Sequence, residues 1–274
     1  MPGVKKRSGG TPNWELRKRS QTGKVSEKLP LVHVTAVGIA REIVHSGKLE
    51  ARRCSVFNKG LLYFFAVRAA YRMKEGDAKS HQINRFPFVF IAKPDAISAP
   101  YHVYPFDTGG AVKGVFEAQS DPYVYLEDYE LAPDMAAAAG HIAWAFGTLE
   151  AYYEGNLRAD VVDDVPAHET VTRGFVDIAR MARSGSNQPD KRASAIEIAC
   201  SHDVQLKDNI LLAILPKQYL EENGGNPNHD FISSLKLFGI PWEVYDWQAN
   251  TTPNEFQEEI AKIAKRFLQK QGLL

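Results

Sequence analysis

The segment RASAIEIACSHDVQLKDNILLAILP, residues 192–216, constrains the fold of this 274-residue chain more than any other. Its small and apolar residues predict buried strands, yet Glu197 stands between Ile196 and Ile198. Burying a carboxylate without a partner costs on the order of several kcal/mol, as much as one large core side chain contributes. Three explanations are open: Glu197 lies on the solvated face of a half-buried strand, it pairs with a nearby Arg or Lys, or it lines a cleft and acts on a substrate.

Strands are predicted both before and after a helical middle section. They are indicated by the apolar runs LPLVHVTA, LLYFFAV and FPFVFIAKP, by two strands divided around SHDVQLKDN, and by LKLFGIPWEVYDW. Apolar residues at helical spacing predict helices in GIAREIVHSGKLEA, with Gly47 as C-cap, DMAAAAGHIAWAFGTLEAYYEG, AHETVTRGFVDIARMAR and TPNEFQEEIAKIAKRFLQKQG. LLYFFAVRAAYRM is expected to run from a strand into a helix. This order of elements predicts an α+β fold with a C-terminal amphipathic helix.

The N-terminal segment differs in composition from the rest of the chain. The first 28 residues carry eight Lys or Arg against two Glu and contain many Gly and Ser residues. Such a composition predicts a flexible basic arm over residues 1–29, which either contacts nucleic acid or is a solvated tail. Residues 30–274 are expected to form a single domain with a helical insert at about 134–184.

The signatures of several common enzyme classes are missing. The chain has no G-x-x-x-x-G-K-[ST], G-x-G-x-x-G, H-E-x-x-H, C-x-x-C or G-x-S-x-G motif, which argues against ordinary ATPases, dehydrogenases, zinc hydrolases and α/β-hydrolases.

The net charge is formally zero, and no apolar run approaches the length of a membrane span or a signal segment. A cytoplasmic protein without membrane or metal is therefore expected.

Three further residues have ordinary structural interpretations. Cys54 and Cys200 are expected to be small core residues and not nucleophiles or zinc ligands. The stretch FDTGGA around Asp107 is typical of a turn and not of a phosphate cradle, because no helix start obviously follows it. Asp107 is accordingly left outside the predicted site.

Four polar residues accompany the early predicted strands. His33 and Thr35 lie on either side of Val34, so their side chains are expected on the same face of a strand. Tyr63 lies in the next strand, and Arg68 follows where a helix is expected to begin. Taken singly, these residues are typical of a packed histidine, a packed tyrosine and a surface arginine, so only their combination and order point to a site.

The order of these motifs resembles the ADP-ribosyltransferase fold, in particular the DarT-type branch of DNA-targeting toxins. That branch carries H-x-T on its first strand, a helix that ends in Gly-x-Leu, a Tyr-Phe segment with an arginine downstream, and a late strand with a glutamate before an apolar stretch. The matching residues here are His33 and Thr35, Gly47 and Leu49, Tyr63, Phe64 and Arg68, and Glu197. The chain departs from the branch at VRAAY, which lacks Ser-Pro-Met, and in the insert from 95 to 190.

The resemblance implies an ADP-ribosyltransferase-like split mixed or antiparallel sheet and an NAD-dependent mono-ADP-ribosyltransferase that modifies a macromolecule. It assigns catalysis to Glu197 and Arg68, and NAD binding to His33, Thr35, Tyr63 and Arg68, with NAD as the substrate. The acceptor is expected to be DNA or RNA before protein, in a bacterial or phage-related toxin or defence effector with an antitoxin as a further partner. The alternatives are an NAD glycohydrolase on the same scaffold and a non-catalytic nucleotide- or nucleic-acid-binding module.

The chemistry of this family suits a carboxylate on a strand. Breaking the bond between nicotinamide and ribose builds positive charge on the ribose, and a carboxylate near the 2-hydroxyl strengthens its contact as that charge develops. His33 and Thr35 would then contact ribose hydroxyls, Tyr63 would stack on the nicotinamide ring, and Arg68 would pair with the phosphates.

Overall fold

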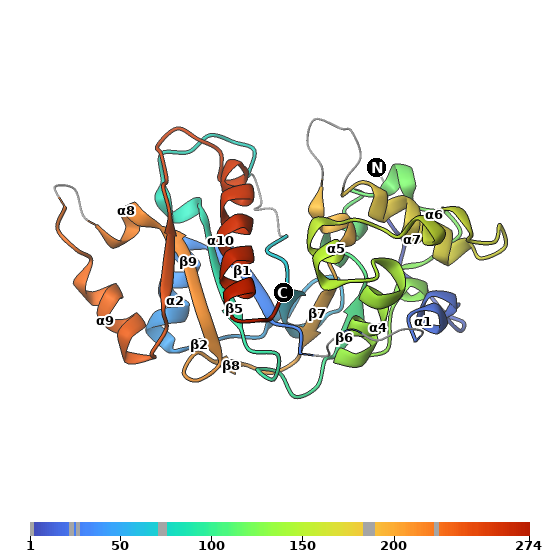
Figure 1. Cartoon of the computed structure of the whole chain (residues 1–274), viewed down its shortest axis with the longest axis horizontal. Coiled ribbons are helices and arrows are strands. Elements are labelled where there is room, and N and C mark those ends of the chain that lie inside the picture. The colour runs from blue at the N-terminus through green and yellow to red at the C-terminus, as the bar shows by residue number, and fades with distance from the viewer. Residues whose placement is uncertain (1–2, 22–24, 26–27, 71–75, 183–189, 222–224) are drawn as a thin grey trace. The chain divides into compact units, whose positions relative to one another are not determined.

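The computed structural model describes all residues except 1–2, 22–24, 26–27, 71–75, 183–189 and 222–224 (Figure 1). Its strands form a mixed parallel and antiparallel sheet and are accompanied by several helices, one of them C-terminal, so the predicted α+β class is confirmed.

The chain forms two compact units, each built from three separate segments. Unit 1 consists of Met1–Leu29, Arg53–Lys59 and Ala99–Cys200, and unit 2 of Pro30–Arg52, Gly60–Ser98 and Ser201–Leu274. The single domain expected over residues 30–274 therefore differs from this division.

Unit 2 is built on a five-stranded run of the sheet. The strand order is β10 (Trp242–Tyr245), β9 (Ile210–Pro216), β5 (Pro87–Ala92), β1 (Leu31–Ala36) and β4 (Lys59–Ala66). β10 pairs with β9 in parallel, and the other neighbours are antiparallel. All six residues of β5 are buried, as its uninterrupted apolar sequence predicts for a central strand. The short strands β2 (Lys48–Leu49) and β8 (Val204–Gln205) form a separate antiparallel pair, and β3 (Arg52–Cys54) spans the boundary between two chain segments.

Helices cover the sheet of unit 2. α2 (Val37–Ser46) packs against β1 and β5 and ends at Gly47, whose left-handed conformation (φ 73°) confirms it as the C-cap. α10 (Gln257–Lys270) packs against β9 and β10 through its buried apolar stripe, so the predicted amphipathic helix is present. The remaining helical segments of the unit are η1 (Ile83–Arg85), α8 (Lys217–Leu220), α9 (His229–Leu237) and η5 (Pro253–Phe256).

In its described residues, unit 1 combines an antiparallel strand pair with short helices. β6 (His102–Tyr104) pairs with β7 (Glu197–Cys200), and Tyr104 lies opposite Glu197. Its helical segments are α1 (Glu15–Arg19), α3 (Thr108–Val112), η2 (Glu117–Gln119), η3 (Leu126–Tyr129), α4 (Met135–Ala145), α5 (Leu149–Glu154), α6 (Ala159–Asp163), α7 (Thr170–Arg180) and η4 (Lys191–Ser194). The single helix expected over residues 134–155 is two helices, because Gly147 is left-handed (φ 83°) and Thr148 caps the start of α5.

The N-terminal segment, expected to be a flexible arm, forms part of unit 1. Leu16 of α1 is fully buried, and the Val4 amide donates to the Ala111 carbonyl at 2.9 Å. Arg7 forms an ion pair with the buried Asp128, and Arg19 forms a two-pronged pair with Glu169. Long-range pairs that composition cannot reveal therefore hold the described part of this segment.

Candidate functional site

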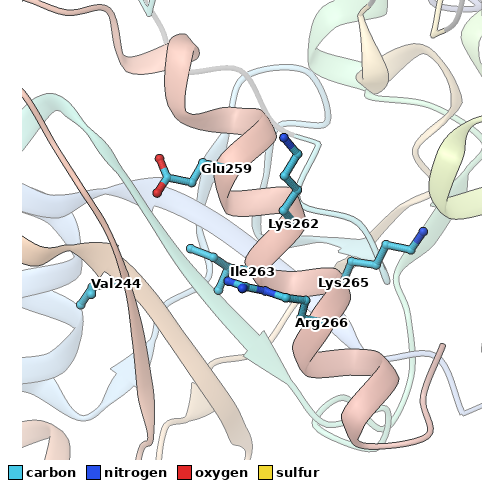
Figure 2. Close-up of a pocket in the computed structure, with 6 residues that line it drawn as sticks. All are labelled: Val244, Glu259, Lys262, Ile263, Lys265 and Arg266. Atoms are coloured by element: carbon cyan, nitrogen blue, oxygen red, sulfur yellow. The ribbon is translucent and has the colours of Figure 1, made fainter.

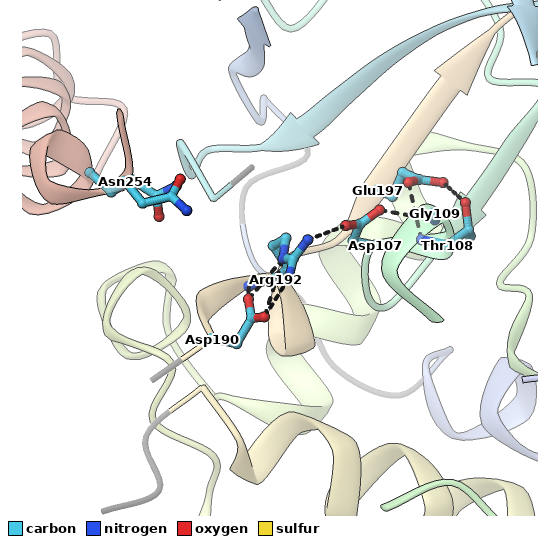
Figure 3. Close-up of polar contacts among 8 residues, drawn as sticks. Asp107, Thr108, Gly109, Asp190, Arg192, Glu197 and Asn254 are labelled. Carbon is cyan, nitrogen blue, oxygen red and sulfur yellow. Dashed lines mark hydrogen bonds and ion pairs between the residues drawn. The ribbon is translucent and has the colours of Figure 1, made fainter. Parts of the chain in front are cut away.

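Glu197 is the first residue of β7, and its side chain is buried (3% exposed). The Thr108 hydroxyl donates to Oε1 at 2.6 Å, and the Thr108 amide donates to Oε2 at 3.2 Å (Figure 3). His102 Nε2 lies 3.2 Å from Oε1. The solvated-face explanation is therefore wrong. Among the described residues, His102 is the one side chain that forms an ion pair with Glu197, so the Arg or Lys partner is not found either.

The strand pair places aromatic side chains on the same face as Glu197. Tyr104 lies directly opposite it, and His102 lies two residues earlier on β6. The Phe57 ring lies 4.4 Å from the His102 ring and 6.0 Å from the Tyr104 ring, measured between centroids. Burial raises the pKa of Tyr104, and the Glu197 charge acts in the same direction, so the phenol remains neutral beside the carboxylate.

A group of charged residues lies close to Glu197, at the start of α3. Asp107 is the N-cap of this helix, and its carboxylate accepts the Gly109 amide at 3.0 Å. Arg192 lies 3.6 Å from Asp107 and is held by a two-pronged contact with Asp190 (Figure 3). The helix start that the sequence did not reveal is thus present, and it brings Asp107 next to Glu197.

Two acidic groups in this region have raised pKa values. Burial raises the pKa of Asp107 to about 6, the negative charge of Glu197 adds to this effect, and Arg192 opposes it. Burial likewise raises the pKa of Glu130, against the opposing effects of Arg17 and His102. Buried carboxylates with raised pKa values occur both at functional sites and in structural ion-pair networks.

The other predicted site residues lie in unit 2. His33 and Thr35 are both on β1 and share one face of the strand, as predicted. His33 Nδ1 lies 2.8 Å from the Tyr63 carbonyl, and its ring lies beside Phe64 and Phe90. Burial lowers the pKa of His33, so its imidazole is neutral at physiological pH.

Tyr63 does not share that face. Val32 of β1 lies opposite Phe65 of β4, so the two side chains point the same way. Tyr63 precedes Phe65 by two residues and therefore points to the side of Val32, away from His33 and Thr35. The structure brings the Tyr63 carbonyl to His33 but places the Tyr63 ring on the other face of the strands.

Arg68 follows a strained turn at the end of β4. Its amide donates to the Ala66 carbonyl at 2.6 Å, which closes a three-residue turn centred on Val67. Val67 has a φ of 62°, a conformation that a β-branched residue rarely adopts. Residues 67–70 are not helical, and the remainder of the helix expected here lies at 71–75, outside the described residues. Arg68 is buried (2% exposed), which corrects the interpretation of this residue as a surface arginine.

Two cavities of unit 2 lie elsewhere. One, of about 410 Å³, lies between α10 and β10 and is lined by Val244, Glu259, Lys262, Ile263, Lys265 and Arg266. Figure 2 shows Glu259 extending from α10 toward Val244 and Lys265 extending away from it, so the charges do not converge on one point. The other, of about 550 Å³, is lined by residues of α2, α8 and α9 and the N-cap of α9. Neither cavity is lined by a predicted site residue.

Sequence reasoning found Glu197 but missed the groups that surround it, namely His102, Thr108, Asp107 and Arg192. One signal was available, since Asp is among the residues preferred at the N-cap of a helix. Among the described residues, no helix has the length and apolar character needed to cross a membrane. No protein-family model, curated protein or solved structure matches this chain.

Proposed function

We propose that the protein is an NAD-dependent mono-ADP-ribosyltransferase that modifies a macromolecule, with Glu197 as its catalytic carboxylate. The observation that supports this most is a buried glutamate on a strand whose two oxygens, among the described residues, are held by Thr108 and His102 and not by an Arg or Lys. A carboxylate with this arrangement offers fixed negative charge in a site of low dielectric constant. Structural pairing alone would favour a guanidinium or ammonium partner instead.

In the proposed reaction the bond between nicotinamide and C1 of the ribose breaks heterolytically. Nicotinamide leaves as a neutral molecule with the electron pair of that bond, and positive charge develops on the ribose. Glu197 stabilises this charge, and a nucleophile of the acceptor then forms a bond to C1 and loses its proton. The protein is proposed to act in the cytoplasm, where NAD is available as its substrate.

For unit 2, taken by itself, the proposed NAD contacts are those that the resemblance assigns. His33, neutral and half-buried, has the hydrogen-bonding capacity to contact a ribose hydroxyl, and Thr35 adds a second polar contact on the same face. The ring of Tyr63 points to the other face, so we leave it out of that contact. Phosphate pairing by Arg68 requires movement of its present neighbours, because its side chain is buried.

A surface feature of unit 1 favours nucleic acid over protein as the acceptor. Lys6 lies 5.2 Å from the centre of the Phe57 ring, and Lys59 lies 4.2 Å from the centre of the exposed Tyr101 ring. We name these four residues the aromatic–lysine cluster. Flat rings beside cations bind single-stranded nucleic acid by stacking and charge, and Phe57 in turn contacts His102, the neighbour of Glu197.

The proposal is tested by incubating the full chain with NAD labelled on its ADP-ribose portion and separate pools of DNA, RNA and protein. Transfer of label to one pool, together with release of nicotinamide, is the expected result for the parent chain. Glu197→Gln should lose both by about 10²–10³-fold, because it keeps the shape of the side chain but removes the charge. A Glu197→Gln protein with parental activity would end the proposal. Nicotinamide release without any labelled acceptor would instead favour the glycohydrolase, and NAD binding without turnover the non-catalytic module.

A further inference from the structure

We infer that Thr108 and His102 are positioning residues that fix the orientation of the Glu197 carboxylate for the proposed reaction. Neither residue was part of the site expected from the sequence. The inference rests on the proposed function, and it adds the groups through which a single glutamate becomes a preorganised electrostatic centre.

Thr108 engages both oxygens of Glu197 at once. Its hydroxyl donates to Oε1 and its amide donates to Oε2, so the carboxylate plane is held from two points on one residue. The hydroxyl contact, at 2.6 Å, is in the range of charge-assisted bonds to carboxylates. Rotation of the carboxylate about its last bond would break both contacts.

The position of Thr108 follows from the start of α3. As the first residue of the helix it has an amide without a partner inside the helix, and this amide is free to bind a carboxylate. Asp107 caps the same turn and needs space, since a Cβ atom on Gly110 would lie 3.0 Å from Asp107 Oδ2. The sequence Asp-Thr-Gly-Gly thus builds a turn that directs two donors at Glu197.

His102 completes the set on the other side of Oε1. An ionised carboxylate only accepts hydrogen bonds, so Nε2 is the donor in the 3.2 Å contact. Phe57 and Tyr104 pack against the imidazole with centroid distances of 4.4 and 5.0 Å, which restricts its rotation. The Nε2 atom of the buried His102 is engaged by Glu197 Oε1, so we assign His102 an effect through Glu197 and not a contact of its own with the substrate.

The consequence concerns turnover more than binding. A carboxylate that must first rotate into place stabilises the transition state less, while contacts with the rest of NAD are unaffected. Loss of the hydroxyl should therefore lower kcat and leave KM for NAD nearly unchanged. A merely structural threonine would lower stability without this separation of the two constants.

The test compares nicotinamide release by the full-length parent and by Thr108→Val, which keeps the shape and the amide but removes the hydroxyl donor. We expect kcat to fall by about 10–100-fold with KM changed less than about twofold. Thr108→Ser, which restores the hydroxyl, should recover most of kcat. Replacement of His102 should follow the same rule, with Gln, which retains an N–H donor, more active than Leu.

Thr148→Val serves as the matched control, because its hydroxyl caps α5 in the same unit and is not bonded to Glu197. It should remain at parental kcat. Parental kcat in Thr108→Val, or an equal loss in Thr148→Val, would overturn the inference.

Crystal structures of Thr108→Val and Thr108→Ser separate this inference from the proposed function. The Glu197 carboxylate should be turned in the valine variant and unchanged in the serine variant, whatever the activity. An unchanged carboxylate in Thr108→Val refutes the positioning role even if Glu197→Gln is inactive. Parental turnover by Glu197→Gln would end the proposed function, while the crystallographic comparison would still decide whether Thr108 fixes the carboxylate.

Discussion

Acidification should destabilise the protein through one buried histidine, His141 of α4. The side chain is fully buried, its Nδ1 lies 2.9 Å from the Ser20 hydroxyl, and its Nε2 has no hydrogen-bond partner among the described residues. Burial lowers the pKa of His141 to about 3, because a proton would place an unsolvated charge among Trp144 and Phe175.

The sign and size of the effect follow from linkage. An unfolded histidine has a pKa of about 6.5, so below that pH the unfolded chain binds a proton that folded His141 does not bind. The loss in the free energy of unfolding caused by His141 is absent above about pH 6.5 and grows as the pH falls toward 3. At about pH 5, roughly 1.5 units below the unfolded pKa, it amounts to about 2 kcal/mol. Asp107 acts in the opposite direction between about pH 6 and 4, because its pKa is raised on folding.

Urea denaturation at about pH 8 and pH 5 measures this effect when the parent chain is compared with His141→Gln. Both proteins contain Asp107, so its contribution cancels, and the parent should lose about 2 kcal/mol more than the variant on acidification. His229→Gln, at an exposed position, is the control and should behave as the parent. Equal pH dependence in the parent and His141→Gln would show that His141 is protonated in the folded state and would refute the reasoning.

Three further sets of substitutions test the packing of unit 1 by urea or thermal denaturation. Glu197→Ala should cost about 3 kcal/mol or more, because it leaves three buried donors without an acceptor. Glu197→Gln keeps one acceptor oxygen for the Thr108 hydroxyl and His102 Nε2 and leaves only the Thr108 amide without an acceptor, so it should cost less, about 1–2 kcal/mol. Equal losses would contradict the hydrogen-bond geometry. Gly174→Ala should lose about 1–3 kcal/mol, because the new Cβ would lie 2.4 Å from the Tyr129 hydroxyl. Adding Tyr129→Phe should recover part of that loss, and no recovery would locate the clash elsewhere. Arg7→Ala should cost about 3 kcal/mol, because its carboxylate partner is buried. Arg19→Ala should cost less than about 1 kcal/mol, because that pair is more exposed. A larger loss for Arg19→Ala than for Arg7→Ala would contradict this reasoning.

The sequence predicted the elements that depend on local pattern. Apolar periodicity located β1, β5, β7, β9 and α10, and Gly47 correctly marked the end of α2. Periodicity could not decide whether Glu197 is buried, because that depends on pairing with β6 and on a helix start 89 residues earlier in the chain. The sequence indicates only a turn at Asp107, because α3 has just five residues, two of them glycine, and little intrinsic helical preference.

The N-terminal segment also depends on long-range contacts, which its composition does not show. Its composition is typical of disorder, yet Arg7 bonds to a carboxylate 121 residues later in the sequence, and Leu16 is fully buried. One buried leucine and a few charge pairs are too few to alter an average over 28 residues. The sequence cannot place Tyr63 on a face of the sheet, because the register of β1 against β4 decides the face and is not visible in either strand alone.

The interleaved segments of the two units have a consequence for the order of events on the ribosome. Unit 1 begins with the first 29 residues but ends at Cys200, and unit 2 begins at Pro30 and is completed only by the C-terminal segment. Thr108 and His102 are synthesised 89 and 95 residues before Glu197, so during translation both residues at first lack this hydrogen-bond acceptor. Neither unit corresponds to a contiguous stretch of the message, and the carboxylate that we propose to act on NAD is among the last parts of unit 1 to be made.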